Sequence, residues 1–344
     1  MCCGWQRGKL LPMPKILRWG VLGVSNFAVR KVIPAIAGCQ FTGVAAIASR
    51  DLARAQTAAR DLGIETAYGS YEELLADPSI DVIYNPLPNH LHVAWSIRAA
   101  DAGKHVLCEK PVALSTGELR NLIAARDRNG VKIAEAFMVR FHPQWTRVVE
   151  LVRGGAIGDL RVVSTAFSYF NRKAENVRNV ADFGGGGLYD IGCYAVHVSR
   201  WLFGTEPLGV FGVVEKDPDF EVDRLASAVL EFGQGQALFV CSTQLFPHQR
   251  VQILGTKGRI EVTIPFNAVP GESMSVLVED ASGIRLESVA ACDQYTLQAD
   301  GFSLAVQGER PVVNGLEESF GNTAVLEAIF ESAESGRRVK PVGL

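Results

Sequence analysis

The sequence lacks the features that would assign it to several specialised classes of protein. Its seven cysteines are scattered and form no CxxC pair, so we expect neither a disulfide framework nor a structural zinc site. Lys and Arg (34) nearly balance Asp and Glu (37), and no basic block occurs, so nucleic acid is not an expected partner. No apolar run is long enough to span a bilayer. Together these absences predict a cytoplasmic protein that does not bind membranes.

The length of the chain favours two domains. It has 344 residues, of which 48% are hydrophobic and 21% charged, a composition typical of folded globular proteins. Pro12 and Pro14 interrupt the only candidate apolar stretch near the start, so residues 1–14 are interpreted as an extension rather than a signal peptide. We expect one domain over residues 15–138 and a second over residues 139–344.

The two predicted domains differ in their hydrophobic patterns. Up to about residue 136, short apolar stretches such as FTGVAAIAS alternate with helical ones such as DLARAQTAARDLG, which predicts an α/β domain with a doubly wound parallel sheet. Later stretches such as LRVVSTAFSYF mix apolar and polar residues between turn signals, which predicts an α+β domain with a large, mostly antiparallel sheet. Because such a sheet needs cover on its second face, we expect a homodimer or homotetramer formed through it.

The first strand ends in GVLGVSNFA, which matches the dinucleotide pattern G-x-G-x-x-G/A at Gly23, Ser25 and Ala28. The glycine permits the tight turn, and the helix that follows offers its N-terminus to a pyrophosphate. Serine at the middle position departs from the pattern. An ordinary strand–helix turn is the alternative, but the position at the first turn of a βαβ unit favours a Rossmann domain. The predicted cofactor contacts here are Gly23, Ser25, Asn26 and Phe27.

The loops after two further strands complete the predicted cofactor site. The second strand ends in Ser49 and Arg50 where NAD-binding proteins usually carry an acidic residue, so NADP is favoured over NAD, although Arg50 could be a surface residue. YNPLPNHLH follows the fourth strand and contributes Pro86, Leu87, Asn89 and His92. The histidines there have no partners at metal-ligand spacing, so no metal is expected, and His92 is interpreted as helix packing.

Two other stretches combine titratable residues with unusual surroundings. In HVLCEKPVAL, a buried-looking strand ends in Glu109 and Lys110, and a lysine there is costly unless it faces a cleft with a partner. The alternative is a surface Glu–Lys pair. In GGGGLYDIGCYAVH, Asp190, Tyr194 and His197 share one helix face just after four glycines. We expect these glycines to let the helix and a substrate approach each other closely.

These stretches, together with EAFMVRFHPQ, resemble the Gfo/Idh/MocA oxidoreductases over nearly the whole chain after residue 15. The resemblance implies an NAD(P)-dependent enzyme acting on sugars, cyclitols or related alcohols. It also implies that Lys110 is the catalytic lysine, Asp190 the motif aspartate and Tyr194 the acid/base group. Tyrosine, rather than the histidine of inositol dehydrogenases, is the pattern of the branch with dihydrodiol dehydrogenases and NADP-linked xylose dehydrogenases.

The expected reaction is hydride transfer between NADP and a carbinol or carbonyl carbon of an aldose, such as xylose or glucose, or of a vicinal diol. Tyr194 would move the proton and Lys110 would stabilise the oxyanion, and we expect the lysine to lower the pKa of the tyrosine. Glu109 and Lys110 are also expected beside the nicotinamide. The alternatives are an NADP(H) sensor without turnover and an enzyme with a non-dissociating cofactor, either an oxidoreductase or a redox-assisted glycosidase.

Four further residues are candidates for contact with the substrate. Arg140 and His142 follow the last strand of the first domain, and Arg140 could equally be structural. Tyr169 lies at the end of the first strand of the second sheet, where aromatic residues are more often core. His197 lies one turn beyond Tyr194, and packing is the favoured interpretation.

Overall fold

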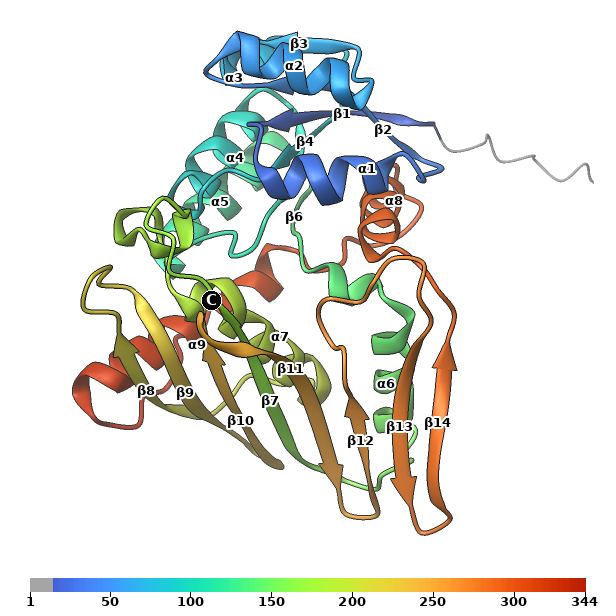
Figure 1. Ribbon diagram of the computed structural model, residues 1–344, viewed down its shortest axis with the longest axis vertical. Helices are drawn as coiled ribbons and strands as arrows, with labels where there is room; N and C mark the ends of the chain where they lie inside the picture. The colour runs from blue at the N-terminus through green and yellow to red at the C-terminus, as the bar shows by residue number, and fades with distance from the viewer. Residues whose placement is uncertain (1–14) are drawn as a thin grey trace, which may run out of the picture.

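The computed structural model describes residues 15–344, whose N-terminal part contains a six-stranded parallel sheet (Figure 1). The strand order is β3-β2-β1-β4-β5-β6, so the order reverses between β1 and β4, where doubly wound folds bind dinucleotides. The prediction of a Rossmann domain is therefore confirmed. The strands are β1 (Leu17–Leu22), β2 (Thr42–Ala48), β3 (Thr66–Tyr68), β4 (Val82–Asn85), β5 (His105–Cys108) and β6 (Ile133–Glu135).

Helices cover both faces of this sheet. One apolar layer joins α3 (Tyr71–Ala76), α4 (His92–Asp101) and α5 (Thr116–Asn129) to the sheet, and the other contains α1 (Ile33–Ile36) and α2 (Leu52–Leu62). Local signals set the ends of α2: Asp51 caps it by accepting from the Arg54 N–H at 3.2 Å, and Gly63 ends it with φ +67°. A π-helical turn over Ala28–Val32 runs directly into α1, where Pro34 occupies the first turn.

The C-terminal part of the described chain contains an eight-stranded sheet in the order β14-β13-β12-β11-β7-β10-β9-β8. Within it only β7 and β10 pair in parallel, which confirms the prediction of a large, mostly antiparallel sheet. Its strands are β7 (Leu160–Phe170), β8 (Gly209–Lys216), β9 (Asp223–Phe232), β10 (Gly235–Ser242), β11 (Gln244–Gly255), β12 (Gly258–Val262), β13 (Met274–Asp280) and β14 (Gly283–Val289).

In the part of the chain that the structure describes, helices cover only one face of the large sheet. α6 (Pro143–Arg153), α7 (Cys193–Phe203) and α9 (Leu316–Ser335) lie on that face (Figure 1) and share an apolar core with the sheet. The other face carries exposed apolar side chains around a hollow of about 400 Å³, among them Phe211, Val213, Val229, Leu238 and Val240. That a second copy covers this face stays a prediction.

α8 (Gln294–Val306) returns to the N-terminal sheet late in the chain. Trp19 donates from Nε1 to Ser303 Oγ at 3.1 Å, and the Asp300 carboxylate accepts from the backbone N–H groups of Gln40 and Phe41. This helix therefore ties the two sheets together, while the boundary expected at residues 138/139 stays a prediction. The expected extension, residues 1–14, lies outside the described residues. Within residues 15–344, no helix has the length and apolar character needed to cross a membrane.

Candidate active site

The two unusual stretches of the sequence meet at an ion pair between Lys110 and Asp190. Lys110 follows β5 and Asp190 lies in the π-helical turn Leu188–Gly192 that leads into α7. Lys110 Nζ lies 3.1 Å from Asp190 Oδ1 and also donates to the Asp190 backbone carbonyl. The two side chains are only 12% and 11% exposed. The fold thus supplies the partner that a lysine at a strand end requires.

The other carboxylate oxygen of Asp190 binds two more side chains. Tyr169 donates its hydroxyl to Oδ2 at 2.6 Å, and Arg178 Nε lies 2.9 Å from the same atom. Burial alone would raise the pKa of Asp190, but Arg178 and Lys110 outweigh it and hold that pKa below its ordinary value. Burial opposes the charge of Lys110, yet the Asp190 carboxylate raises the lysine pKa overall. The ion pair therefore stays charged.

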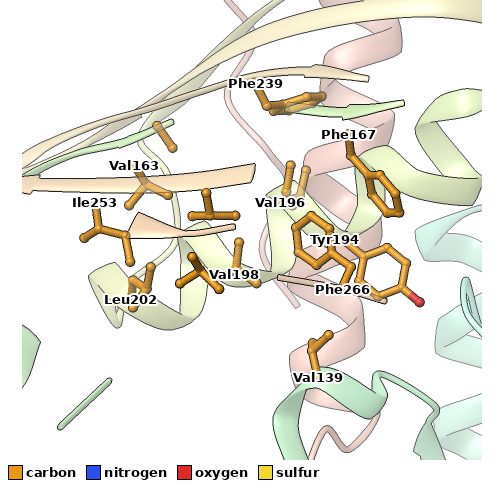
Figure 2. Close-up of a cluster of buried hydrophobic side chains, with 14 of the residues drawn as sticks. Val139, Val163, Phe167, Tyr194, Val196, Val198, Leu202, Phe239, Ile253 and Phe266 are labelled. Carbon is orange, nitrogen blue, oxygen red and sulfur yellow. The ribbon is translucent and has the colours of Figure 1, made fainter. Parts of the chain in front are cut away.

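Tyr194 lies beside this pair with its ring packed in the apolar core of the C-terminal unit. Lys110 Nζ lies 5.1 Å from the ring centre, and the hydroxyl donates to Met138 Sδ at 3.3 Å. Figure 2 shows the ring among Phe167 and Phe266, with its oxygen pointing away from these apolar side chains. Burial raises the pKa of Tyr194 well above its ordinary value. The expectation that Lys110 lowers this pKa is therefore wrong, because burial of the hydroxyl dominates.

Three of the four candidate substrate residues make structural contacts instead. His197 is 2% exposed and stacks on Phe137 with ring centres 4.2 Å apart, and neither ring nitrogen has a hydrogen-bond partner within residues 15–344. Arg140 lies over the Trp201 ring and pairs with a glutamate of α9 at 3.2 Å. His142 is 1% exposed and caps α6 by accepting from the Gln144 N–H. Among the four, only Tyr169 joins the Lys110–Asp190 pair.

The four glycines are needed by the protein's own atoms. A Cβ on Gly186, whose φ is +112°, would lie 1.9 Å from Asp223 Oδ1, and one on Gly185 would lie 2.5 Å from the Arg178 carbonyl oxygen. Asp223 Oδ2 accepts from the Leu188 N–H at 2.6 Å, so this distant carboxylate caps the turn that carries Asp190. The expectation that the glycines admit a substrate is therefore corrected, because Asp223 and Arg178 fill that space.

The first loop of the N-terminal sheet has the form needed for a dinucleotide. Gly23 has φ +83°, and a Cβ there would lie 3.0 Å from a Leu87 methyl carbon. Ser25 Oγ accepts from the Ala28 N–H at 3.1 Å, so the serine that departs from the pattern caps the following helix. Asn26 and Phe27 begin that helix, and the Phe27 ring packs edge-on against a tyrosine of α8.

Two arginines lie in and just after the second loop, and one of them contacts the first loop. Ser49 Oγ accepts from the Asp51 N–H at 3.2 Å, while Arg50 is exposed. Arg54 donates from Nη2 to the carbonyl oxygen of Val24 at 2.7 Å and so joins the two loops. Our sequence reasoning missed Arg54, although its place in the first turn of α2, three residues after Asp51, could have indicated it. Two cations beside the first loop suit the extra phosphate of NADP.

The remaining predicted cofactor residues lie in the loops after β4 and β5 or form hydrogen bonds with them. His92 is buried, with Nδ1 2.7 Å from the Pro111 carbonyl oxygen and Nε2 2.6 Å from that of Leu87. Burial lowers the pKa of His92 to about 4. Asn89 donates to the Gly184 carbonyl at 2.8 Å, and Pro86 lies between Asn85 and Leu87 in the same loop. Glu109 accepts from the Tyr84 hydroxyl at 2.7 Å, and burial raises its pKa.

Within the described residues, no group of three or more His, Cys, Asp or Glu side chains could hold a metal ion. The side chains gathered at the site are one lysine, one aspartate, one tyrosine and the adjacent Tyr169 and Arg178. This group combines a hydroxyl that holds a proton with a fixed cation next to it. Such a pair can exchange a proton with a substrate oxygen and stabilise negative charge that develops on that oxygen.

Two family models match most of the chain. Residues 17–137 match an oxidoreductase family with an NAD-binding Rossmann fold, and residues 145–261 match the GFO/IDH/MocA C-terminal domain. The D-xylose 1-dehydrogenase (NADP⁺) 2 of Haloferax volcanii is 40% identical, over 94% of this chain and 99% of that protein. The human trans-1,2-dihydrobenzene-1,2-diol dehydrogenase is 34% identical, over 72% of this chain and 75% of that protein.

A solved structure is similar over almost the whole described fold. It is a Tyr→Phe variant of a 3-ketoreductase from Actinomadura kijaniata in complex with TDP-benzene and NADP, with a TM-score of 0.87, 28% identity, and coverage of 92% of this chain and 97% of that one. A Lys→Ala variant of the same ketoreductase has also been solved. The two replaced positions lie as many residues apart in that chain as Lys110 and Tyr194 do in this one.

Proposed function

This chain belongs to the GFO/IDH/MocA family of oxidoreductases, and on that basis we propose that it transfers hydride between NADP and the anomeric carbon of an aldose. The observation that carries the proposal is the contact of Lys110 with both Asp190 and the ring of Tyr194. The aldose is favoured over a cyclic diol because the xylose dehydrogenase is more similar and matches more of the chain than the diol dehydrogenase does.

The residues present fit NADP as the cofactor. The positive φ of Gly23 and the helix capped by Ser25 form a cradle for a pyrophosphate, and Gly23 leaves no room for a side chain beside Leu87. Arg50 and Arg54 are the cations assigned to the 2′-phosphate, and the neighbouring acidic residue, Asp51, is engaged in capping α2. When bound, the nicotinamide supplies the hydride chemistry of the reaction.

The proton chemistry belongs to Tyr194 and Lys110. Because burial raises its pKa, Tyr194 holds its proton at neutral pH and is ready to donate it to a carbonyl oxygen during reduction. In oxidation the tyrosine must first lose that proton to accept one from the substrate hydroxyl, so a higher pH favours this direction. Lys110, kept charged by Asp190, stabilises the negative charge on the substrate oxygen in both directions.

The proposal is tested by following NADPH formation from NADP with a panel of aldoses, cyclitols and trans-diols. Turnover with aldoses should be lost in Tyr194→Phe, and retained in Tyr68→Phe, whose hydroxyl binds Asp77 in the N-terminal unit. A preference for cyclitols or diols would overturn the aldose assignment. Absence of turnover with every substrate, together with tight NADPH binding, would favour the sensor or the enzyme with a non-dissociating cofactor.

A further inference from the structure

Arg178 is a residue of the site that no motif indicated. It lies in the segment between β7 and α7, which reaches the N-terminal unit (Figure 1) through the hydrogen bond from Asn89 to Gly184 and the stacking of His90 on Phe183. The backbone of Arg178 is fixed at both ends: its N–H donates to Asn176 Oδ1 at 3.0 Å and its carbonyl accepts from the Gly186 N–H at 2.9 Å. These hydrogen bonds therefore hold the backbone of Arg178 in a fixed position beside the site.

Within the described part of the chain, two of the three guanidinium nitrogens of Arg178 are free to donate hydrogen bonds to a ligand. Its Nε is held by Asp190, whereas neither Nη1 nor Nη2 has a hydrogen-bond partner within residues 15–344, and the side chain is 41% exposed. Asp190 also has capacity left, because a carboxylate offers about four lone-pair sites and three are taken by Lys110, Tyr169 and Arg178. One free acceptor and free donors thus lie beside each other next to Lys110.

A hydroxyl group is the substrate feature that matches such a pair, because it donates one hydrogen bond and accepts another. Lys110 and Arg178 bind the two oxygens of the same carboxylate, so their remaining donors serve substrate oxygens that are close together. We propose, building on the function proposed above, that Arg178 and Asp190 bind the hydroxyl on the carbon next to the reacting carbon. The enzyme would therefore select aldoses with a C2 hydroxyl and reject their 2-deoxy counterparts.

The test compares kcat/KM for D-xylose and 2-deoxy-D-xylose in wild type, Arg178→Met and Arg172→Met. Arg172 is the matched control, because it lies in the same segment but pairs with Asp219 at 2.5 Å. A hydrogen bond to a charged group predicts that wild type and Arg172→Met favour D-xylose by about tenfold to a hundredfold. In Arg178→Met this preference should fall severalfold, because D-xylose alone loses a contact while Asp190 still accepts from its C2 hydroxyl.

Two outcomes would overturn the inference. If D-xylose and 2-deoxy-D-xylose lose the same factor in Arg178→Met, the arginine only positions Asp190. If wild type prefers a uronic acid such as D-xyluronate and Arg178→Met removes that preference, the guanidinium binds an anion rather than a hydroxyl.

A binding measurement separates this inference from the proposed function. Calorimetric titration of the NADPH-loaded protein with xylitol requires no turnover, so it applies even if no aldose is a substrate. Weaker binding of xylitol in Arg178→Met than in wild type and Arg172→Met supports the hydroxyl site. Equal binding in all three proteins would contradict it, whether or not the aldose assignment holds.

Discussion

Replacing Gly186 by alanine should damage both the stability and the activity of this protein. The new Cβ would lie 1.9 Å from Asp223 Oδ1, at a residue whose φ of +112° already disfavours any side chain. The backbone strain costs about 1–2 kcal/mol. Displacing Asp223 would also remove the cap on the Leu188 N–H and leave a buried carboxylate without its partner, so the total should reach about 3–6 kcal/mol.

Gly283→Ala is a matched control for the strain alone. Gly283 has nearly the same φ, +114°, but an added Cβ there would meet no atom within 4 Å. We expect Gly283→Ala to lower the free energy of unfolding by about 1–2 kcal/mol and to leave turnover unchanged. Gly186→Ala should also lower kcat, because the Asp190 N–H donates to the Gly186 carbonyl and Asp190 moves with this turn.

The assay is urea unfolding of both variants, of Asp223→Gly and of the double variant Gly186→Ala/Asp223→Gly, with kcat measured in parallel. Removing the Asp223 side chain removes the clash, so the double variant should lose less stability than the two single variants added together. The reasoning is refuted if Gly186→Ala is as stable as Gly283→Ala. It is also refuted if the loss of unfolding free energy in the double variant equals the sum of the losses in the two single variants.

Three further predictions concern proton transfer, cofactor choice and assembly. Because burial raises the pKa of Tyr194, kcat/KM for oxidation should keep rising with pH on the alkaline side; a plateau already at neutral pH would contradict this. Arg50→Gln should raise KM for NADP about tenfold or more and leave KM for NAD unchanged, with Arg60→Gln in the following helix α2 as control; equal losses for both cofactors would rule out a phosphate contact. If a second copy covers the open face of the large sheet, Val213→Glu combined with Leu238→Glu should yield monomers in sedimentation experiments, because both side chains are exposed on that face. A monomeric wild type would contradict this prediction.

Much of the fold follows from local signals in the sequence. Alternating short strands and helices predicted the parallel sheet, and the stretch DLARAQTAARDLG, predicted to be helical, contains α2. Two strands were missed. β3 has only three residues, and β14, which reads GIRLESV, lies at an edge of the sheet with Ile284 and Leu286 exposed. The helix α6 over residues 143–153 was also missed.

The catalytic candidates Lys110, Asp190 and Tyr194 could be proposed from the sequence, because each lies in a motif with an unusual local context. Their relation could not, because the lysine and the aspartate are 80 residues apart and only folding brings Nζ to the carboxylate. The same holds for the pKa of Tyr194, which depends on how deeply the hydroxyl is buried. The sequence also suggested His142 and His197 as candidates for substrate contact. Only the structure shows that His142 caps a helix and that His197 stacks on Phe137.

The sequence by itself determined the pattern of a parallel sheet followed by a mostly antiparallel one, the tight turn at Gly23 and the residue types available for chemistry, because strand periodicity, turn glycines and helix caps act over short distances. Only the tertiary structure decided what the four glycines are for and that Arg178 belongs to the site. Gly186 makes room for Asp223, and Arg178 reaches Asp190 from an irregular loop with no repeating pattern. Contacts between residues far apart in the chain depend on the packing of whole elements, and no local pattern encodes them.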